Sequence, residues 1–262
     1  MADSFNGLYV GISTDKLTSN TFLQLINEAA ARGDFGALAV AFTTCPNEKD
    51  KKTIEDRLLI AFDVCRDEGR LEEIRPYLSR KGMSFRALAR AHKEFQSNGE
   101  KKLLEQNMVG SIDSCSESFL DGVSAALKPL SHVSNKVIMA AGRAFERTNR
   151  SFALEELLAR MDLENATREN LENMLLNSID SHVQKGEKTF VGQVVDRQPR
   201  LQFGTKAALV AARDEAVINS QKLGRGNPLQ GDGVQCKPDR TLIHKFRELI
   251  ARIKTPGKKQ SL

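Results

Sequence analysis

The sequence of 262 residues has no tryptophan and only two tyrosines. Proteins that hold single-stranded nucleic acid without sequence preference commonly stack its bases on aromatic rings, so base stacking is not expected here. The four cysteines, Cys45, Cys65, Cys115 and Cys236, are widely separated, and the CxxC or Cys/His spacing of a structural zinc site does not occur. We expect reduced cysteines in a cytosolic or nuclear protein, and no metal site.

Long apolar runs and catalytic motifs are also missing. No run approaches the ~20 apolar residues of a membrane-spanning helix, and no signal peptide is recognised, so any contact with a membrane would be peripheral. The HExxH, GxSxG, P-loop and GxGxxG patterns are absent, and none of the four histidines has a catalytic partner in its local sequence. His92 is expected on a helix surface. We therefore predict a protein that is not an enzyme, with no catalytic residue and no cofactor.

Basic charge, in contrast, is abundant and concentrated in two blocks. The net charge is +5, but residues 74–102 carry eight basic and two acidic side chains, and residues 222–262 carry ten and three. Residues 1–73 and residues 103–181 each have a net charge of −5. Basic blocks attract phosphate, on nucleic acid or on lipid headgroups. A solvated face that only keeps the protein soluble is the alternative.

The basic segment, residues 75–93, contains no acidic residue. Gly82 and Ser84 predict a break followed by a helix N-cap. Beyond the break, basic residues recur at i, i+4 and i+7, which places three cations on one helical face. We predict binding to phosphate, membrane or RNA by the segment and by two lysines that follow it: Arg75, Arg80, Lys81, Arg86, Arg90, Lys93, Lys101 and Lys102.

Apolar residues recur with a helical period along most of the chain, which predicts an all-α fold. Residues 186–204 are the exception and fit either a short strand or an irregular loop. Helices are expected from Asn20 to Gly33, from Phe35 to Phe42, from a cap at Thr53 to Gly69, from Leu71 to Leu78, after Ser84, around residues 119–127, and over about 133–145, 154–161, 168–183 and 206–220.

Gly33 and Gly69 lie 36 residues apart in similar surroundings, and Gly99 follows after another 30. This spacing resembles a helical repeat, although ordinary helical hairpins explain it equally well.

The C-terminal part combines a linker with an amphipathic helix. Residues 223–239 hold four glycines and two prolines, which predicts a flexible linker. Beyond it, apolar residues recur at three and four, and five basic residues occupy the other faces: Arg240, Lys245, Arg247, Arg252 and Lys254. Such a helix suits an anionic membrane, a partner groove or RNA, unless its apolar stripe docks on the body of the protein. The chain is expected to fold into two helical domains. Residues 1–155 form the first, a multi-helix bundle, and residues 165–262 form the second.

Two motifs lie in the first hundred residues of the sequence. The first is Gly-Ala-Leu-Ala-Val-Ala-Phe-Thr over residues 36–43, followed by Pro-Asn-Glu over residues 46–48 and by a charged helix containing Arg-Leu-Leu-Ile over residues 57–60. The second is Arg-Lys-Gly-Met-Ser-Phe-Arg over residues 80–86. The first motif resembles the helix-loop-helix of the matrix proteins of orthomyxoviruses (influenza-type), and the second is similar to that family's basic pair followed by an apolar residue, Ser or Thr, and Phe. The sequence lacks the family's Cys/Cys/His/His cluster, which suggests a distant branch such as the thogotoviruses and argues against a metal site.

The resemblance implies a structural role. Such proteins form an oligomeric layer beneath the viral envelope, bind anionic lipid and the viral ribonucleoprotein without sequence specificity, and visit the host cytoplasm, the inner face of the plasma membrane and the nucleus. It also implies two helical domains that meet near residues 150–165. Acidic blocks facing the basic block of the next protomer offer a route to self-association. Two other functions stay open: an RNA-coating protein of the nucleocapsid type, and a helical-repeat adaptor that binds another protein.

Overall fold

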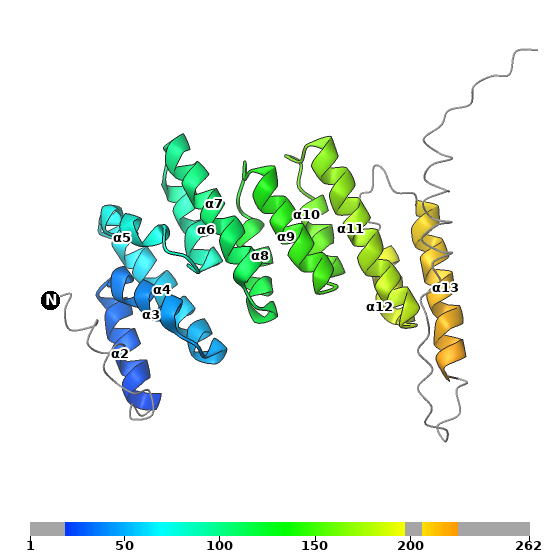
Figure 1. Ribbon diagram of the computed structural model, residues 1–262, viewed down its shortest axis with the longest axis horizontal. Coiled ribbons are helices and arrows are strands. Elements are labelled where there is room, and N and C mark those ends of the chain that lie inside the picture. The colour runs from blue at the N-terminus through cyan, green and yellow to red at the C-terminus, as the bar shows by residue number, and fades with distance from the viewer. Residues whose placement is uncertain (1–18, 197–205, 225–262) are drawn as a thin grey trace, which may run out of the picture. The chain divides into compact units, whose positions relative to one another are not determined.

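The computed structural model describes residues 19–196 and 206–224, and their regular structure is entirely helical (Figure 1). No strand occurs in these two ranges, so the predicted all-α fold is confirmed there. The predicted C-terminal helix, with Arg240 to Lys254, lies outside the described residues. The α-helices are α2 (Ser19–Ala31), α3 (Phe35–Thr44), α4 (Glu48–Asp67), α5 (Leu71–Leu78), α6 (Phe85–Glu94), α7 (Asn98–Ser114), α8 (Leu120–Leu127), α9 (Asn135–Arg147), α10 (Ser151–Leu158), α11 (Asn165–Gln184), α12 (Lys188–Asp196) and α13 (Lys206–Gly224), and a short 3-10 helix, Glu117–Phe119, precedes α8.

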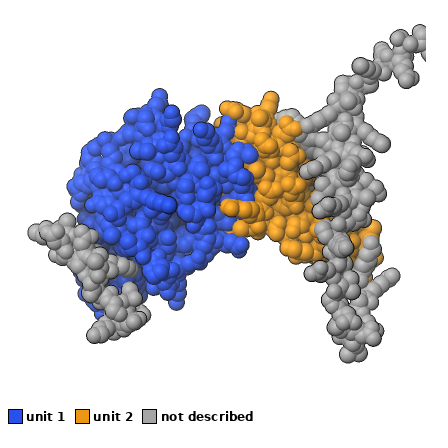
Figure 2. Space-filling model, viewed as in Figure 1, with its two compact units in different colours: residues 1–144 blue, residues 145–262 orange. Residues whose placement is uncertain are grey.

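The chain forms two compact units that divide between Ala144 and Phe145 (Figure 2). Unit 1 contains α2 to α8 and most of α9, and unit 2 contains the end of α9 and α10 to α13. Domains of residues 1–155 and 165–262 stay a prediction.

Helix α4 forms the centre of the unit 1 core and contacts α2, α3, α5 and α6. Its side chains Ile54, Leu58 and Phe62 are completely buried. The ring of Phe62 meets that of Phe35 edge to face, with 6.1 Å between the ring centroids. Because aromatic and branched apolar side chains contribute most of the buried area, this helix holds the surrounding helices together.

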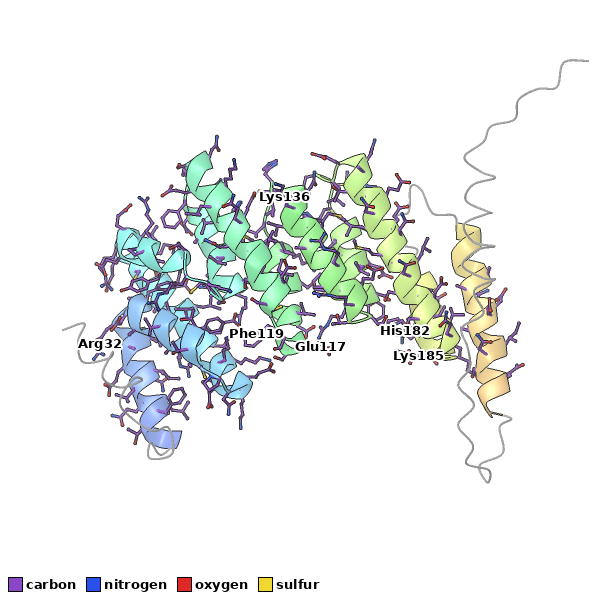
Figure 3. The ribbon with its side chains drawn as sticks, in the orientation of Figure 1. Arg32, Glu117, Phe119, Lys136, His182 and Lys185 are labelled. Atoms are coloured by element: carbon purple, nitrogen blue, oxygen red, sulfur yellow. The ribbon has the colours of Figure 1, made fainter. Side chains whose placement is uncertain are left out.

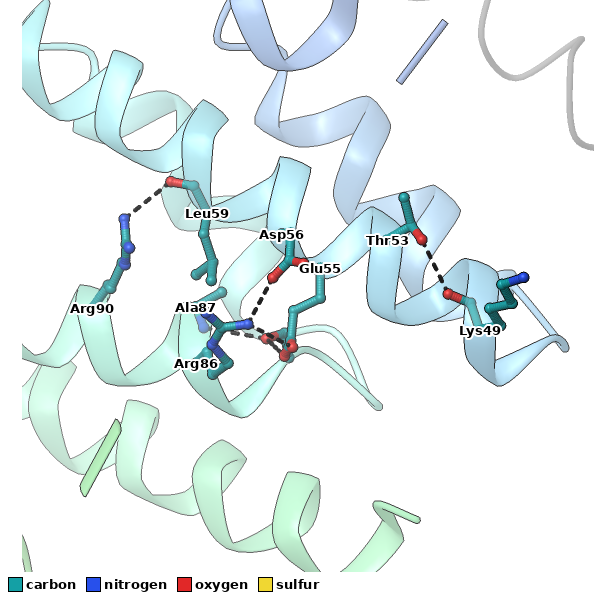
Figure 4. Close-up of polar contacts among 9 residues, drawn as sticks. Lys49, Thr53, Glu55, Asp56, Leu59, Arg86, Ala87 and Arg90 are labelled. Carbon is teal, nitrogen blue, oxygen red and sulfur yellow. Dashed lines mark hydrogen bonds and ion pairs between the residues drawn. The ribbon is translucent and has the colours of Figure 1, made fainter. Parts of the chain in front are cut away.

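The start of α4 differs from the prediction. The side chain of Asn47 caps the helix by accepting hydrogen bonds from the backbone N–H groups of Lys49, at 2.9 Å, and Asp50, at 3.3 Å. The predicted cap, Thr53, is wrong: it lies inside the helix, where its hydroxyl donates to the carbonyl of Lys49 at 3.2 Å (Figure 4). A Ser or Thr in mid-helix commonly bonds back to the preceding turn in this way.

Two glycines end helices in the same way, as their similar surroundings suggest. Gly33, after α2, has φ +68°, and Gly69, after α4, has φ +71°. At each glycine, backbone N–H groups donate hydrogen bonds back to carbonyls of the last helical turn. At the end of α4, the N–H of Gly69 donates to the carbonyl of Arg66 at 3.1 Å, and the N–H of Arg70 donates to that of Cys65 at 2.7 Å. This is the hydrogen-bond pattern of a Schellman motif, which favours glycine because the φ is positive. Gly99, the third member of the predicted series, is not a helix end: it lies at the start of α7.

A closer repeat has an offset of 50 residues. Helices α3 and α6 begin at Phe35 and Phe85, and each is followed by a turn and a longer helix, α4 or α7. Buried and exposed positions recur at this offset through both helix pairs. The identical pairs are Phe35/Phe85, Ala37/Ala87, Leu38/Leu88, Ala39/Ala89, Ala41/Ala91, Lys51/Lys101, Lys52/Lys102, Glu55/Glu105, Asp63/Asp113 and Cys65/Cys115. Unit 1 therefore contains one helical hairpin twice.

Helix α12 corrects the prediction for residues 186–204. Lys188–Asp196 is helical, where a strand or loop was expected. Val191 and Val194 are buried, and they lie three residues apart, which places them on one helical face. Packing against α11 and α13 outweighs the strand preference of valine.

Candidate phosphate-binding surface

The turn between α5 and α6 has the local structure that the sequence predicted. Gly82 has φ +78°, and the side chain of Ser84 caps α6 by accepting from the backbone N–H of Ala87 at 3.3 Å. Arg80 and Lys81 are exposed in this turn. The guanidinium carbon of Arg80 lies over the ring of Tyr77, 5.8 Å from its centroid, which leaves its polar edge available to solvent.

The two arginines of α6 are neutralised by α4. Arg86 lies 3.2 Å from the carboxylate of Glu55 and 2.9 Å from that of Asp56 (Figure 4). Arg90 forms an ion pair with Asp63 and donates to the carbonyl of Leu59 at 3.1 Å. Because their charges are compensated in place, these two arginines add little free positive charge to the face on which they were predicted.

Arg75 is also compensated. Its guanidinium lies 3.0 Å from Glu72 and 2.8 Å from Glu100, and it covers the ring of Phe95 at 5.1 Å. The remaining predicted cations are Arg80, Lys81, Lys93 and Lys102, which we call the exposed cations, and Lys101, which is half-buried. Across the part of the chain that the structure describes, no ion pair involves any of these five. The basic segment is therefore split into cations that hold helices together and cations that face solvent.

Two carboxylates at equivalent positions of the repeated hairpin, the buried Glu55 and the partly buried Glu105, were not predicted. Glu55, 4% exposed, accepts from the hydroxyl of Ser84 at 2.5 Å. Its repeat mate Glu105 accepts from the backbone N–H of Ser134 at 3.0 Å and lies 3.1 Å from His92. Each carboxylate thus sits at the start of the helix that begins about 30 residues further on, where the helix dipole favours negative charge.

His92 is buried, only 3% exposed, and not on a helix surface as predicted. It lies in α6 on the side that packs against α7, with Glu105 as its partner. The i, i+4, i+7 pattern of the cations gives their helical face, but it does not show that α7 covers the side of α6 on which His92 lies.

Unit 2 holds a half-buried carboxyl group, Asp180 of α11. Burial, followed by the negative charge of Glu215 on α13, raises the pKa of Asp180 from its ordinary value of 3.8 to about 6. Near it, α13 donates a hydrogen bond from the side chain of Asn219 to the carbonyl of Val183 at 3.1 Å. Protonation of Asp180 removes the repulsion from Glu215 and the cost of a buried charge.

We expect unit 2 to be more stable in mild acid. Because the folded pKa of Asp180 lies above its unfolded value, the stabilisation is present below pH 3.8 and is lost as the pH rises through about 6. The variant Asp180→Asn should unfold at a higher urea concentration than the wild type at pH 7.5, and the difference should shrink towards pH 5. A difference that stays constant over this range would contradict the assignment.

Searches of protein families, curated proteins and solved structures found no match. In residues 19–196 and 206–224, no helix is long and apolar enough to cross a membrane. The same residues contain no cluster of three or more His, Cys, Asp or Glu side chains suited to a metal ion.

Proposed function

We propose that the protein is a viral matrix protein of the orthomyxovirus type, which forms an oligomeric layer beneath the envelope. It binds anionic lipid from the inner side of the membrane and the viral ribonucleoprotein from the other, and it passes through the host cytoplasm and nucleus. The proposal rests on the motif resemblance and on one observation. Arg80 and Lys81, the basic pair of the second motif, are exposed and without an acidic partner among the described residues, while Arg75, Arg86 and Arg90 are paired.

Exposed cations of this kind suit phosphate groups rather than particular bases. Lysine and arginine contacts to phosphate carry no sequence information, and each adds about 1 kcal/mol near an anionic membrane surface. A turn between two helices presents its side chains on a fixed backbone, because Ser84 caps the helix that follows. One surface can therefore serve both lipid and ribonucleoprotein.

The variant Arg80→Ala/Lys81→Ala should bind both ligands about 10-fold or more weakly. The measurements are flotation with anionic and with neutral liposomes across a salt series, and RNA binding by fluorescence anisotropy. The matched control is Lys49→Ala/Lys52→Ala, which removes two exposed lysines of α4 and the same charge. Loss of only one ligand would contradict a shared surface, and equal loss in both variants would show an effect of net charge alone.

A helical-repeat adaptor is the second candidate, favoured by the hairpin that recurs at an offset of 50 residues. An adaptor would remain monomeric and would not bind phosphate at physiological salt. Electron microscopy of the liposome-bound fraction separates the two functions, because a matrix protein should form an ordered coat on anionic vesicles.

A further inference from the structure

A groove of about 650 Å³ runs between α7 and α9 in unit 1. Helix α7 contributes residues at i, i+3, i+4 and i+7, and α9 contributes its N-terminal end and one face of its next two turns. A hydrogen bond from the N–H of Ser134 to Glu105 joins the start of α9 to α7. Val109 and Met139 form an apolar floor. The lining residues are Lys102, Glu105, Gln106, Val109, Ser134, Asn135, Lys136, Met139 and Arg143.

The rim of the α7–α9 groove is positively charged. Lys102, Lys136 and Arg143 are exposed, and none of the three forms an ion pair with another described residue. Figure 3 places Lys136 at the N-terminal end of α9. The one acid of the groove, Glu105, is already engaged by Ser134 and His92. The groove therefore offers three uncompensated positive charges around an apolar floor.

The spacing of the cations favours an extended acidic ligand. Lys136 and Arg143 are seven residues apart on α9, which corresponds to about 10 Å along the helix axis. Cations so far apart do not converge on a single phosphate group. An amphipathic helix laid along the groove would meet both, because its own side chains recur at the same interval on one face.

We infer that the α7–α9 groove binds an acidic amphipathic helix of a partner protein. The partner's apolar side chains, at i, i+3 or i+4 and i+7, contact Val109 and Met139. Its flanking carboxylates pair with Lys102, Lys136 and Arg143. This inference goes beyond the proposed function, because Lys136 and Arg143 are not among the exposed cations assigned to lipid and ribonucleoprotein, and only Lys102 is shared with them.

The test uses the full chain and two synthetic probes in fluorescence polarisation. The first probe is a fluorescein-labelled helical peptide of ~18 residues, long enough to span the groove, with leucines at i, i+4 and i+7 flanked by glutamates. The second probe has lysine in place of every glutamate. The wild type should bind the glutamate peptide and not the lysine peptide. The variant Lys136→Glu/Arg143→Glu should bind the glutamate peptide at least ~10-fold more weakly and should gain affinity for the lysine peptide.

The matched control is Lys81→Glu/Lys93→Glu, which makes the same change of charge at two exposed cations outside the groove. This variant should keep its affinity for the glutamate peptide to within ~3-fold. The inference is overturned if both double variants lose the peptide equally, or if the wild type does not distinguish the two probes. It is also overturned if Lys136→Glu/Arg143→Glu abolishes flotation with anionic vesicles while the peptide does not bind the wild type. That last result would assign the groove to lipid phosphate.

Discussion

Replacing Glu55 by alanine is expected to lower the free energy of unfolding by about 3 kcal/mol. The carboxylate is 4% exposed and accepts from the hydroxyl of Ser84 at 2.5 Å and from Arg86 at 3.2 Å. Its removal leaves a buried hydroxyl and a half-buried guanidinium with fewer partners, and groups stranded in this way carry most of the cost of breaking a buried pair. Urea unfolding followed by circular dichroism measures the loss.

The neighbouring residue provides the control for this prediction. Asp56 contacts the same guanidinium at 2.9 Å, but it is 52% exposed. Because water screens an exposed ion pair, Asp56→Ala should cost at most about 1 kcal/mol. Equal losses from the two alanine variants would show that the burial of Glu55 is unimportant, and that Ser84 caps α6 without help from α4.

The same contacts show how far the sequence predicts the candidate surface. The break at Gly82 and the cap at Ser84 depend on neighbouring residues, and both predictions are confirmed. The acidic partners of Arg86 and Arg90 could not be predicted from neighbouring residues, because Glu55 and Asp63 lie 31 and 27 residues earlier in the chain. A local pattern of cations gives their helical face, but only the packing of α6 against α4 shows that acids occupy that face.

The sequence alone did not reveal the repeated hairpin, for a related reason. The identical pairs at an offset of 50 are mostly alanines, lysines and single apolar residues, which many unrelated helices share. The repeat becomes clear only when the buried positions are known, because Ile54 corresponds to Leu104 and Phe62 to Ile112. Cores accept such exchanges when the pattern and volume are kept, so the fold can recur with little sequence identity. Helix α7 itself was not predicted, since charged and polar residues interrupt its apolar positions.

The largest loss of stability is expected from Phe62→Ala, at about 4 kcal/mol. The side chain is completely buried in α4, and its ring meets that of Phe35, which in turn meets Tyr77 of α5 with 6.4 Å between the ring centroids. Truncation removes apolar contacts shared by three helices and leaves a cavity, because close-packed surroundings relax only partly.

Ile60 is the control for Phe62, since it lies in the same helix but is 43% exposed. Ile60→Ala should change the free energy of unfolding by less than about 1 kcal/mol, measured by the same urea titration. A similar small loss for Phe62→Ala would mean that α4 is not the centre of the unit 1 core. In that case Glu55 would not be held rigidly at the start of α6, and the ion pairs that neutralise Arg86 and Arg90 would also be weaker than their geometry implies. The two stability measurements therefore test the same helix from its apolar and its charged side.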